Sequence, residues 1–404
     1  LAEKEEDRTE WAIKFYDKLS SFDYMTSTPT LFYSGNVRNQ LSSCFLSTFE
    51  DSIYGIFVCF HQEAQKSKFA GGLGMDFTPF RAGGSYINGT NGYTQGAVYF
   101  WKLFNDMLVA VQQGGRRQGA GCGYLETWHA DIEDFLELRK NVGEDRRRTH
   151  DMNTANWIPD LFIKQVNSDE DWYLFSPNEV PELHSLFGSE FEQKYWEYVE
   201  QGKQGKLTCF KRTAAKDLWK KMLKMLFETS SPWITFKDPS NIRYSDQHEG
   251  TVFSSNLCTE IIRHSKSTSY EPNNDRKIKE YGETAVCNLG SFNLANHVDE
   301  HGNIDYAKLA TTIEVGFRML DNVIDINFYP TQEAKKSNKR HRPVGMGSMG
   351  WADLFLKKKL SYDSDEAIQL SDELYEFISY HSILASSKLA KERGAYESYE
   401  GSLW

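Results

Sequence analysis

The 404-residue chain lacks any apolar run long enough to span a membrane and has no signal-peptide pattern. Its six cysteines form no CxxC pair and no spacing typical of a zinc site. The net charge of −11 lacks the surplus of Lys and Arg that general nucleic-acid binding requires. We therefore expect a cytoplasmic protein with reduced thiols, and neither a membrane protein nor a nucleic-acid binder.

The composition is that of a folded, globular protein, with 40% hydrophobic and 14% aromatic residues. The length allows one large domain or two ordinary ones. Strand-like and helix-like patterns alternate along the chain, which predicts an α/β architecture with buried strands but does not distinguish an open sheet from a barrel. The first residue is Leu and not Met, so we expect the chain to be a piece of a longer polypeptide.

Several elements follow from the spacing of apolar residues. We expect helices over residues 3–20, 51–66, 95–113 and 306–326, and strands over 40–49 and 156–162. Cys59, Cys122 and Cys209 have no chemical motif around them, and we interpret them as packing residues.

The segment 254–262 places one cysteine, Cys258, between Asn256 and Glu260. On an extended chain these three side chains would project from one face, because side chains alternate along a strand. A lone cysteine is usually a small buried hydrophobe. Burying an amide and a carboxylate on the same face is costly without partners, however, so we predict a functional thiol here.

Residues 256–261 resemble the radical-cysteine loop of the class I ribonucleotide reductase large subunit, and residues 39–46 and 285–294 resemble two other stretches of that family in the same order. The resemblance runs from about Phe22 to Trp404. It implies a ten-stranded α/β barrel with a central finger loop, incomplete in this chain. We expect residues 1–25 to end an N-terminal helical region and residues 26–404 to form the catalytic barrel, truncated before its final strands.

The resemblance implies reduction of ribonucleotides, as diphosphates, to 2′-deoxyribonucleotides. Replacing an unactivated 2′-OH by hydrogen requires a radical. Cys258, as a thiyl, would remove the 3′-hydrogen, while Glu260 acts as general base and Asn256 orients the substrate hydroxyls. Cys44 and Cys287 would supply two electrons by forming a disulfide. The substrate-binding positions that the resemblance implies are Thr28, Ser43, Cys44, Gly72, Asn256 and Glu260.

The family also has an allosteric site for deoxynucleoside triphosphates, with ATP as a further effector. The matching positions here are Asp51, Ser52, Ile53, Arg81 and Arg117. Without the resemblance, Asp51 or Ser52 is a helix cap, and Arg117 is a solvated residue in a glycine-rich loop.

The resemblance implies several partners: a radical-generating dimetal small subunit, thioredoxin or glutaredoxin as reductant, a second large subunit, and the C-terminal portion of the large subunit. We expect no tightly bound cofactor and no metal site in this chain. Activity is expected only after combination with the C-terminal portion and the small subunit. Two alternatives stay open: a cobalamin-dependent reductase of the same superfamily, and a non-catalytic nucleotide-binding module with inert cysteines.

Overall fold

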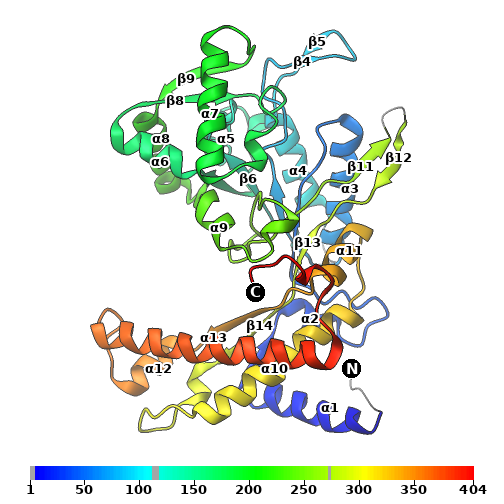
Figure 1. The fold of residues 1–404 in the computed structure, drawn as a ribbon, viewed down its shortest axis with the longest axis vertical. Helices are drawn as coiled ribbons and strands as arrows, with labels where there is room; N and C mark the ends of the chain where they lie inside the picture. Colours follow the sequence, from blue (N-terminus) through cyan, green and yellow to red (C-terminus); the bar gives the residue numbers. More distant parts are fainter. Residues whose placement is uncertain (1–4, 112–117, 272–273) are drawn as a thin grey trace. The chain divides into compact units, whose positions relative to one another are not determined.

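The computed structural model describes residues 5–111, 118–271 and 274–404. The chain divides into two compact units (Figure 1). Unit 1 contains the residues up to Ser43 together with Val286–Tyr329 and Asn338–Tyr399. Unit 2 contains Cys44–Ala285, Pro330–Ser337 and Glu400–Trp404.

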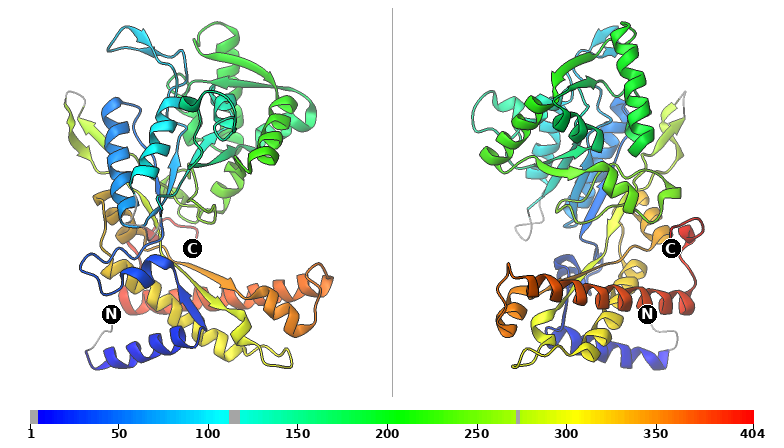
Figure 2. Two further views of the ribbon diagram at one scale, coloured as in Figure 1. Left: turned by 180° about the vertical axis from the view of Figure 1, so that it is seen from behind. Right: turned by 60° about the vertical axis from the view of Figure 1, so that its left-hand side comes forward.

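Unit 2 is built on parallel strands in the order β10-β7-β6-β3-β2. Their bounds are β2 (Cys44–Ser47), β3 (Gly72–Asp76), β6 (Gly121–Glu126), β7 (Asn153–Ile158) and β10 (Trp233–Phe236). Figure 2 shows the ribbon from two further sides. A sixth strand, β13 (Ala285–Cys287), follows β2 in the order, and its first residue belongs to this unit. Parallel strands need crossover connections, and helices in the intervening segments provide them.

The two faces of this sheet differ, as β6 illustrates. A Cβ on Gly121 would lie 2.9 Å from Leu108 Cδ1 of helix α4 (Val98–Ala110), and one on Gly123 would overlap the ring of Phe77. These glycines therefore face the packed helical layer. Because side chains alternate along a strand, Cys122 and Tyr124 face the opposite side.

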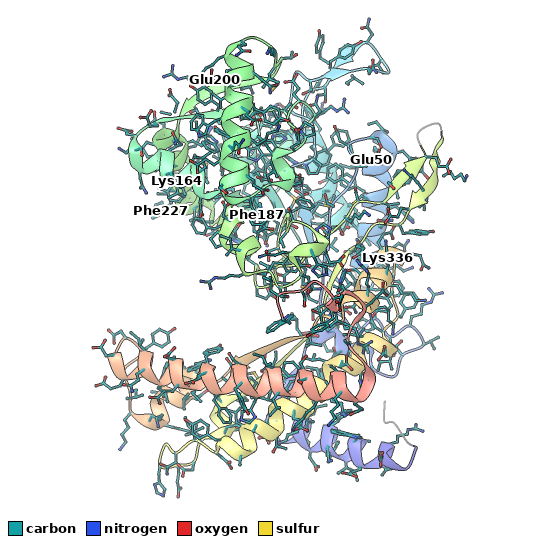
Figure 3. All side chains as sticks on the ribbon, viewed as in Figure 1. Glu50, Lys164, Phe187, Glu200, Phe227 and Lys336 are labelled. Atoms are coloured by element: carbon teal, nitrogen blue, oxygen red, sulfur yellow. The ribbon has the colours of Figure 1, made fainter. Side chains whose placement is uncertain are left out.

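The other elements of unit 2 surround this sheet. Figure 3 shows Lys164, Glu200 and Phe227 on the surfaces of α6, α7 and α8, where Phe227 is 92% exposed. The helices are α3 (Ile53–Lys68), α5 (Ile132–Leu136), α6 (Asp160–Ser168), α7 (Gly188–Lys203), α8 (Ala215–Thr229) and α9 (Lys237–Arg243), and α11 (Gln332–His341) begins in this unit. Three antiparallel pairs are formed by β4 (Tyr86–Ile87) with β5 (Gly92–Tyr93), β8 (Asp171–Phe175) with β9 (Phe210–Ala214), and β11 (Ser269–Glu271) with β12 (Asn274–Glu280).

Unit 1 has a small sheet in the order β1-β14-β15. Strand β14 (Leu289–Asn293) pairs antiparallel with β1 (Tyr24–Thr26) and parallel with β15 (Gly345–Met349). The helices are α1 (Glu5–Ser20), α2 (Thr28–Tyr33), α10 (Tyr306–Ile326), α12 (Trp351–Lys358) and α13 (Asp365–Arg393).

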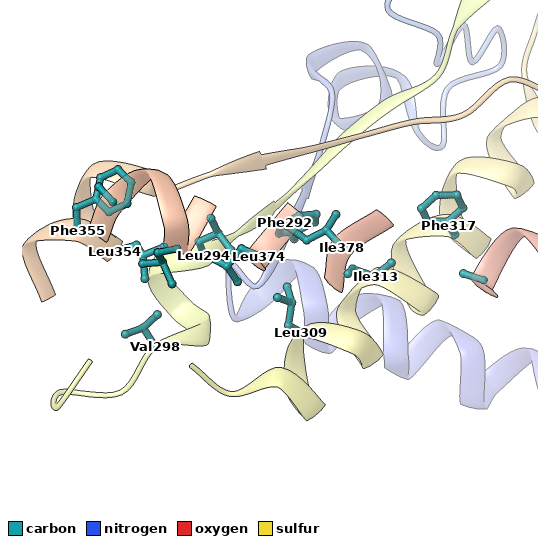
Figure 4. Packing of buried hydrophobic residues seen from close by; sticks show 13 residues of the cluster. Phe292, Leu294, Val298, Leu309, Ile313, Phe317, Leu354, Phe355, Leu374 and Ile378 are labelled. Atoms are coloured by element: carbon teal, nitrogen blue, oxygen red, sulfur yellow. The ribbon is translucent and has the colours of Figure 1, made fainter. Parts of the chain in front are cut away.

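The hydrophobic core of unit 1 lies where the long helices α10 and α13 pack together and α10 packs on β14. Figure 4 shows Leu309 and Ile313 of α10 close to Phe292 of β14, with Leu374 and Ile378 from α13 in the same cluster. These α10 and α13 residues are each spaced four apart, which places each pair on one helix face. Burial of these faces holds the two helices against the sheet.

The α/β prediction is confirmed, and the helices expected over 3–20, 51–66, 95–113 and 306–326 are present, with small differences at the ends that the structure describes. Residues 3, 4, 112 and 113 of these predictions lie outside the described residues. The strand expected over 156–162 is partly wrong, because β7 ends at Ile158 and α6 begins at Asp160. Asp160 N instead donates to Asp238 Oδ2 at 2.6 Å, which secures this helix start. Within the described residues, no helix is both long and apolar enough to cross a membrane.

Candidate active site

The segment around Cys258 is a turn, which corrects the expectation of an extended chain. Ser255 and Ile262 form an isolated antiparallel bridge, and the backbone reverses between them. Thr259 N donates to Asn256 O at 3.2 Å, and Thr259 has a φ of +71°. The prediction that Asn256, Cys258 and Glu260 project from one face of an extended chain is therefore wrong, because side chains alternate in this way only along a strand.

Asn256 organises this turn through its own side chain. Its Oδ1 accepts hydrogen bonds from Glu260 N and Ile261 N, each at 3.1 Å. The residue is fully buried, and within the described part of the chain its Nδ2 has no hydrogen-bond partner. A buried donor without a partner is costly, so this amide is available to a ligand.

The side chains at the tip of the turn are exposed, in contrast to the buried Asn256. Cys258 and Glu260 are exposed, whereas the neighbouring Leu257 is half-buried and packs against the cluster that includes Trp157. The turn is thus anchored on the sheet by apolar contacts while the thiol and the carboxylate remain accessible.

Two glycines of β3 make room for this turn. A Cβ on Gly74 would overlap the carbonyl oxygen of Ser255, and one on Gly72 would lie 3.3 Å from both Leu257 Cδ2 and Cys44 Sγ. Glycine at these alternate positions lets the backbone of the turn approach the strand closely.

Cys44 lies on the same face of the sheet, because it is the register partner of Gly72 in the parallel pair β2–β3. Its side chain is only 3% exposed. The contact distances at Gly72 therefore bring Cys44, Gly72 and Leu257 together in one place. Three of the expected site positions, Cys44, Gly72 and the 256–260 turn, are adjacent.

Tyr124 of β6 supports the turn from the sheet. Its hydroxyl lies 2.6 Å from Asn256 O and 3.0 Å from Thr259 Oγ1. Burial raises the pKa of this phenol well above its usual value, so it stays protonated at neutral pH. Burial likewise raises the pKa of Cys122, on the same face, which fits the packing role expected for that thiol.

The remaining substrate and redox positions lie in unit 1. Ser43 N donates to Cys287 O at 2.9 Å, and Cys287 is 2% exposed. Ser43 Oγ is buried and has no hydrogen-bond partner among the described residues, whereas Thr28 is exposed at the start of α2. Cys44 belongs to unit 2, so the pairing of Cys44 with Cys287 stays a prediction.

The expected effector positions meet at the N-terminus of α3. Ser52 is the N-cap and accepts from Gly55 N at 3.0 Å, so the capping interpretation of Ser52 is confirmed. Arg81 Nε donates to Asp51 Oδ2 at 2.8 Å. Burial raises the Asp51 pKa, and Arg81 opposes that rise. Ile53 is 66% exposed, and Arg117 lies outside the described residues.

A cluster of charged groups lies at the carboxyl ends of β3 and β6. His184 bridges two buried carboxylates, with Nε2 2.8 Å from Asp76 Oδ2 and Nδ1 2.7 Å from Glu126 Oε1. Lys237 Nζ donates to the same Glu126, at 2.8 Å to Oε2. Burial alone would lower the His184 pKa, but Asp76 and Glu126 outweigh it and raise the pKa to about 9. The His184 ring stacks on Phe253, which precedes the Cys258 turn.

The described residues contain no group of His, Cys, Asp and Glu side chains that could hold a metal ion. The two carboxylates of the cluster, Asp76 and Glu126, lie beside the side chains of His184 and Lys237.

Sequence reasoning missed Tyr124, Gly74 and the left-handed Thr259. The signal for the glycines was present, because Gly72 and Gly74 repeat at the two-residue period of one strand face. Tyr124 had no local signal, since its partner Asn256 is 132 positions away.

Two family models match the chain. Residues 42–404 match the ribonucleotide reductase barrel domain, and residues 1–39 match the ribonucleotide reductase all-alpha domain.

Three curated relatives are each named as the alpha or large subunit of ribonucleoside-diphosphate reductase. The chain is 54% identical to the ribonucleoside-diphosphate reductase subunit alpha of Chlamydia muridarum over 404 residues, which is 100% of this chain and 37% of that protein. It is 38% identical to the subunit alpha of Helicobacter pylori, covering 100% and 55%, and 41% identical to the large subunit of Arabidopsis thaliana, covering 98% and 49%. The chain thus spans about a third to a half of the length of these relatives.

Proposed function

Because the chain belongs to the ribonucleotide reductase large-subunit family, we propose that it forms part of an enzyme that reduces ribonucleoside diphosphates to 2′-deoxyribonucleotides. The observation that carries this proposal is the turn itself, where the exposed Cys258 thiol and Glu260 carboxylate stand beside the buried, unpartnered amide of Asn256. A hydrogen-abstracting thiol, a base and a donor for substrate hydroxyls are the groups that the reaction requires.

In the proposed reaction, the Cys258 thiyl removes the 3′-hydrogen of the ribose. Glu260 accepts the 3′-OH proton, and Asn256 Nδ2 donates to a substrate hydroxyl. The 2′-OH leaves as water, and two thiols supply two electrons and two protons as they become a disulfide. We assign those thiols to Cys44 and Cys287. At the end Cys258 returns the hydrogen to C3′ of the product, which regenerates the thiyl radical.

Substrate binding is proposed at Thr28, Ser43 and Gly72. The unpartnered Ser43 hydroxyl can bond a polar substrate group, and the missing side chain at Gly72 leaves space beside Cys44. The deoxynucleotide effector is proposed to bind at residues 51–53, Arg81 and Arg117. The Asp51–Arg81 pair supports this placement, because it sets a cation beside the N-terminus of α3, where anions are favoured.

The proposed partners are a dimetal small subunit that generates the radical, a second large subunit, the remaining C-terminal part of the large subunit, and thioredoxin or glutaredoxin, all in the cytoplasm. The family implies a separate source for the radical, since class I enzymes carry it on another subunit. Cobalamin-dependent reduction is the competing mechanism, and it requires adenosylcobalamin instead of the small subunit.

The test uses the full-length polypeptide containing this chain, assayed with its small subunit and a dithiol reductant. We expect Cys258→Ser to remove deoxynucleotide formation, because an oxygen cannot replace sulfur as the radical carrier, while effector binding is retained. Cys209→Ser, a buried thiol outside the turn, is the control and should keep turnover. Persistent turnover in Cys258→Ser would refute the proposal, and turnover with adenosylcobalamin alone would favour the competing mechanism.

A further inference from the structure

The turn that carries Cys258 is strained. Thr259 adopts a φ of +71°, a left-handed conformation that a β-branched residue rarely occupies. Such conformations are energetically costly and persist only where the surroundings enforce them. The groups that hold Thr259 therefore decide where the adjacent thiol lies.

Tyr124 contacts both sides of this strained segment. Its hydroxyl lies 2.6 Å from Asn256 O, which can only accept, so the phenol donates that bond. The phenol has one hydrogen, so Thr259 Oγ1, 3.0 Å away, donates to it in return. The phenol thus joins the residues that flank Leu257 and Cys258.

The phenol is itself held rigidly. Tyr124 is fully buried in β6, whose two strand neighbours are β3 and β7, and its ring packs edge-on against Trp157 with centroids 5.9 Å apart. A hydroxyl on a buried ring of a central strand has a fixed position. This hydroxyl can therefore hold the turn in one position while the tip of the turn stays exposed.

We infer that Tyr124 is a positioning residue for the radical cysteine: its hydroxyl clamps Asn256 and Thr259 and so fixes the Cys258 thiol relative to the ribose. The inference rests on the function proposed for Cys258 and adds to it a group outside the turn. Hydrogen abstraction requires short reach and correct alignment, so a small displacement of the thiol slows the reaction while the substrate still binds.

The test is Tyr124→Phe in the full-length protein with its small subunit, because this change removes the hydroxyl and keeps the ring. We expect kcat to fall by roughly tenfold to a hundredfold with an unchanged KM for the nucleotide, since alignment and not binding is lost. Amide hydrogen exchange at Thr259 and Glu260 should become faster, because both amides bond to Asn256.

Tyr195→Phe is the matched control. The Tyr195 hydroxyl is equally buried in unit 2 and bonds to the backbone of Tyr173, at 2.7 Å from its N and 3.0 Å from its O. Its loss should leave kcat and exchange in the turn unchanged. An equal fall in kcat in both variants, or wild-type kcat and exchange in Tyr124→Phe, would overturn the inference.

Substitutions at Thr259 provide a second test of the inference if Tyr124→Phe does not fold. Thr259→Val removes the bonded hydroxyl and should lower kcat, while Thr259→Ser keeps the hydroxyl and should restore it. Wild-type kcat in Thr259→Val would overturn the inference. Amide exchange does not depend on the reaction. If Cys258→Ser retained turnover, the proposed function would be wrong, but amide exchange in Tyr124→Phe would still test whether Tyr124 holds the turn.

Discussion

At the scale of single residues, Asn256 has two separable tasks. Its Oδ1 shapes the turn by accepting from two successive backbone amides, and its Nδ2, which has no hydrogen-bond partner among the described residues, is the group that we propose donates to the substrate. An aspartate or a leucine could perform at most one of these tasks, because only a carboxamide combines an acceptor and a donor in this geometry.

We predict that Asn256→Ala lowers the free energy of unfolding by about 1–3 kcal/mol, because two backbone donors lose their acceptor, and also abolishes turnover. Asn105→Ala is a matched control, since Asn105 Oδ1 accepts from Asp151 N and Met152 N at 2.9 Å each. Urea unfolding should give similar losses in both variants, and only Asn256→Ala should be inactive. Substantial turnover in Asn256→Ala would contradict the role given to Nδ2.

At the scale of elements, the start of α3 brings a helix N-terminus and an arginine together. Ser52 satisfies one free amide of the first turn, and Arg81 is held beside it by Asp51. A phosphate binding here would meet both the helix dipole and the guanidinium. The hydrogen bond from Arg81 Nε to Asp51 Oδ2 orients the guanidinium at this helix start.

We predict that Arg81→Gln weakens deoxynucleoside triphosphate binding by about 1.5–3 kcal/mol, the range for a hydrogen bond to a charged group. Calorimetry on the full-length protein measures this directly. Arg147→Gln serves as the control, because Arg147 also pairs with a carboxylate, Asp134 at 2.8 Å, but lies in the charged run after α5. Equal affinities for Arg81→Gln and the wild type would place the effector elsewhere.

At the scale of the whole molecule, the His184 cluster makes the free energy of unfolding depend on pH. Its folded pKa of about 9 lies above the ordinary value of 6.5, so the protonated form is favoured by folding. The stabilisation that protonated His184 provides is therefore complete below about pH 6.5 and is lost as the pH rises through about 9. The facing charges are those of Asp76, Glu126 and Lys237.

We predict that the free energy of unfolding falls between about pH 6.5 and pH 9, by at most roughly 3 kcal/mol from this group. His184→Gln should lower stability at neutral pH, because two buried carboxylates lose a counter-charge, and should flatten the curve in this window. His301→Gln, at an exposed site, should keep the wild-type slope. An unchanged slope in His184→Gln would show that another group controls this pH range.

Local patterns in the sequence were enough to predict the candidate thiol, amide and carboxylate at 256–260, the glycines that admit a close backbone, and the amphipathic helices. These are local properties, because side-chain type and apolar periodicity depend on a few neighbouring positions. The folded structure was needed to see that the segment is a turn and not a strand, that Tyr124 contacts it, and that His184 bridges Asp76 and Glu126. The contacts of Tyr124 and His184 join residues far apart in the chain, so no local pattern predicts them. The turn is held by Asn256 Oδ1, which accepts from Glu260 N and Ile261 N where a strand would place those amides in ladder bonds.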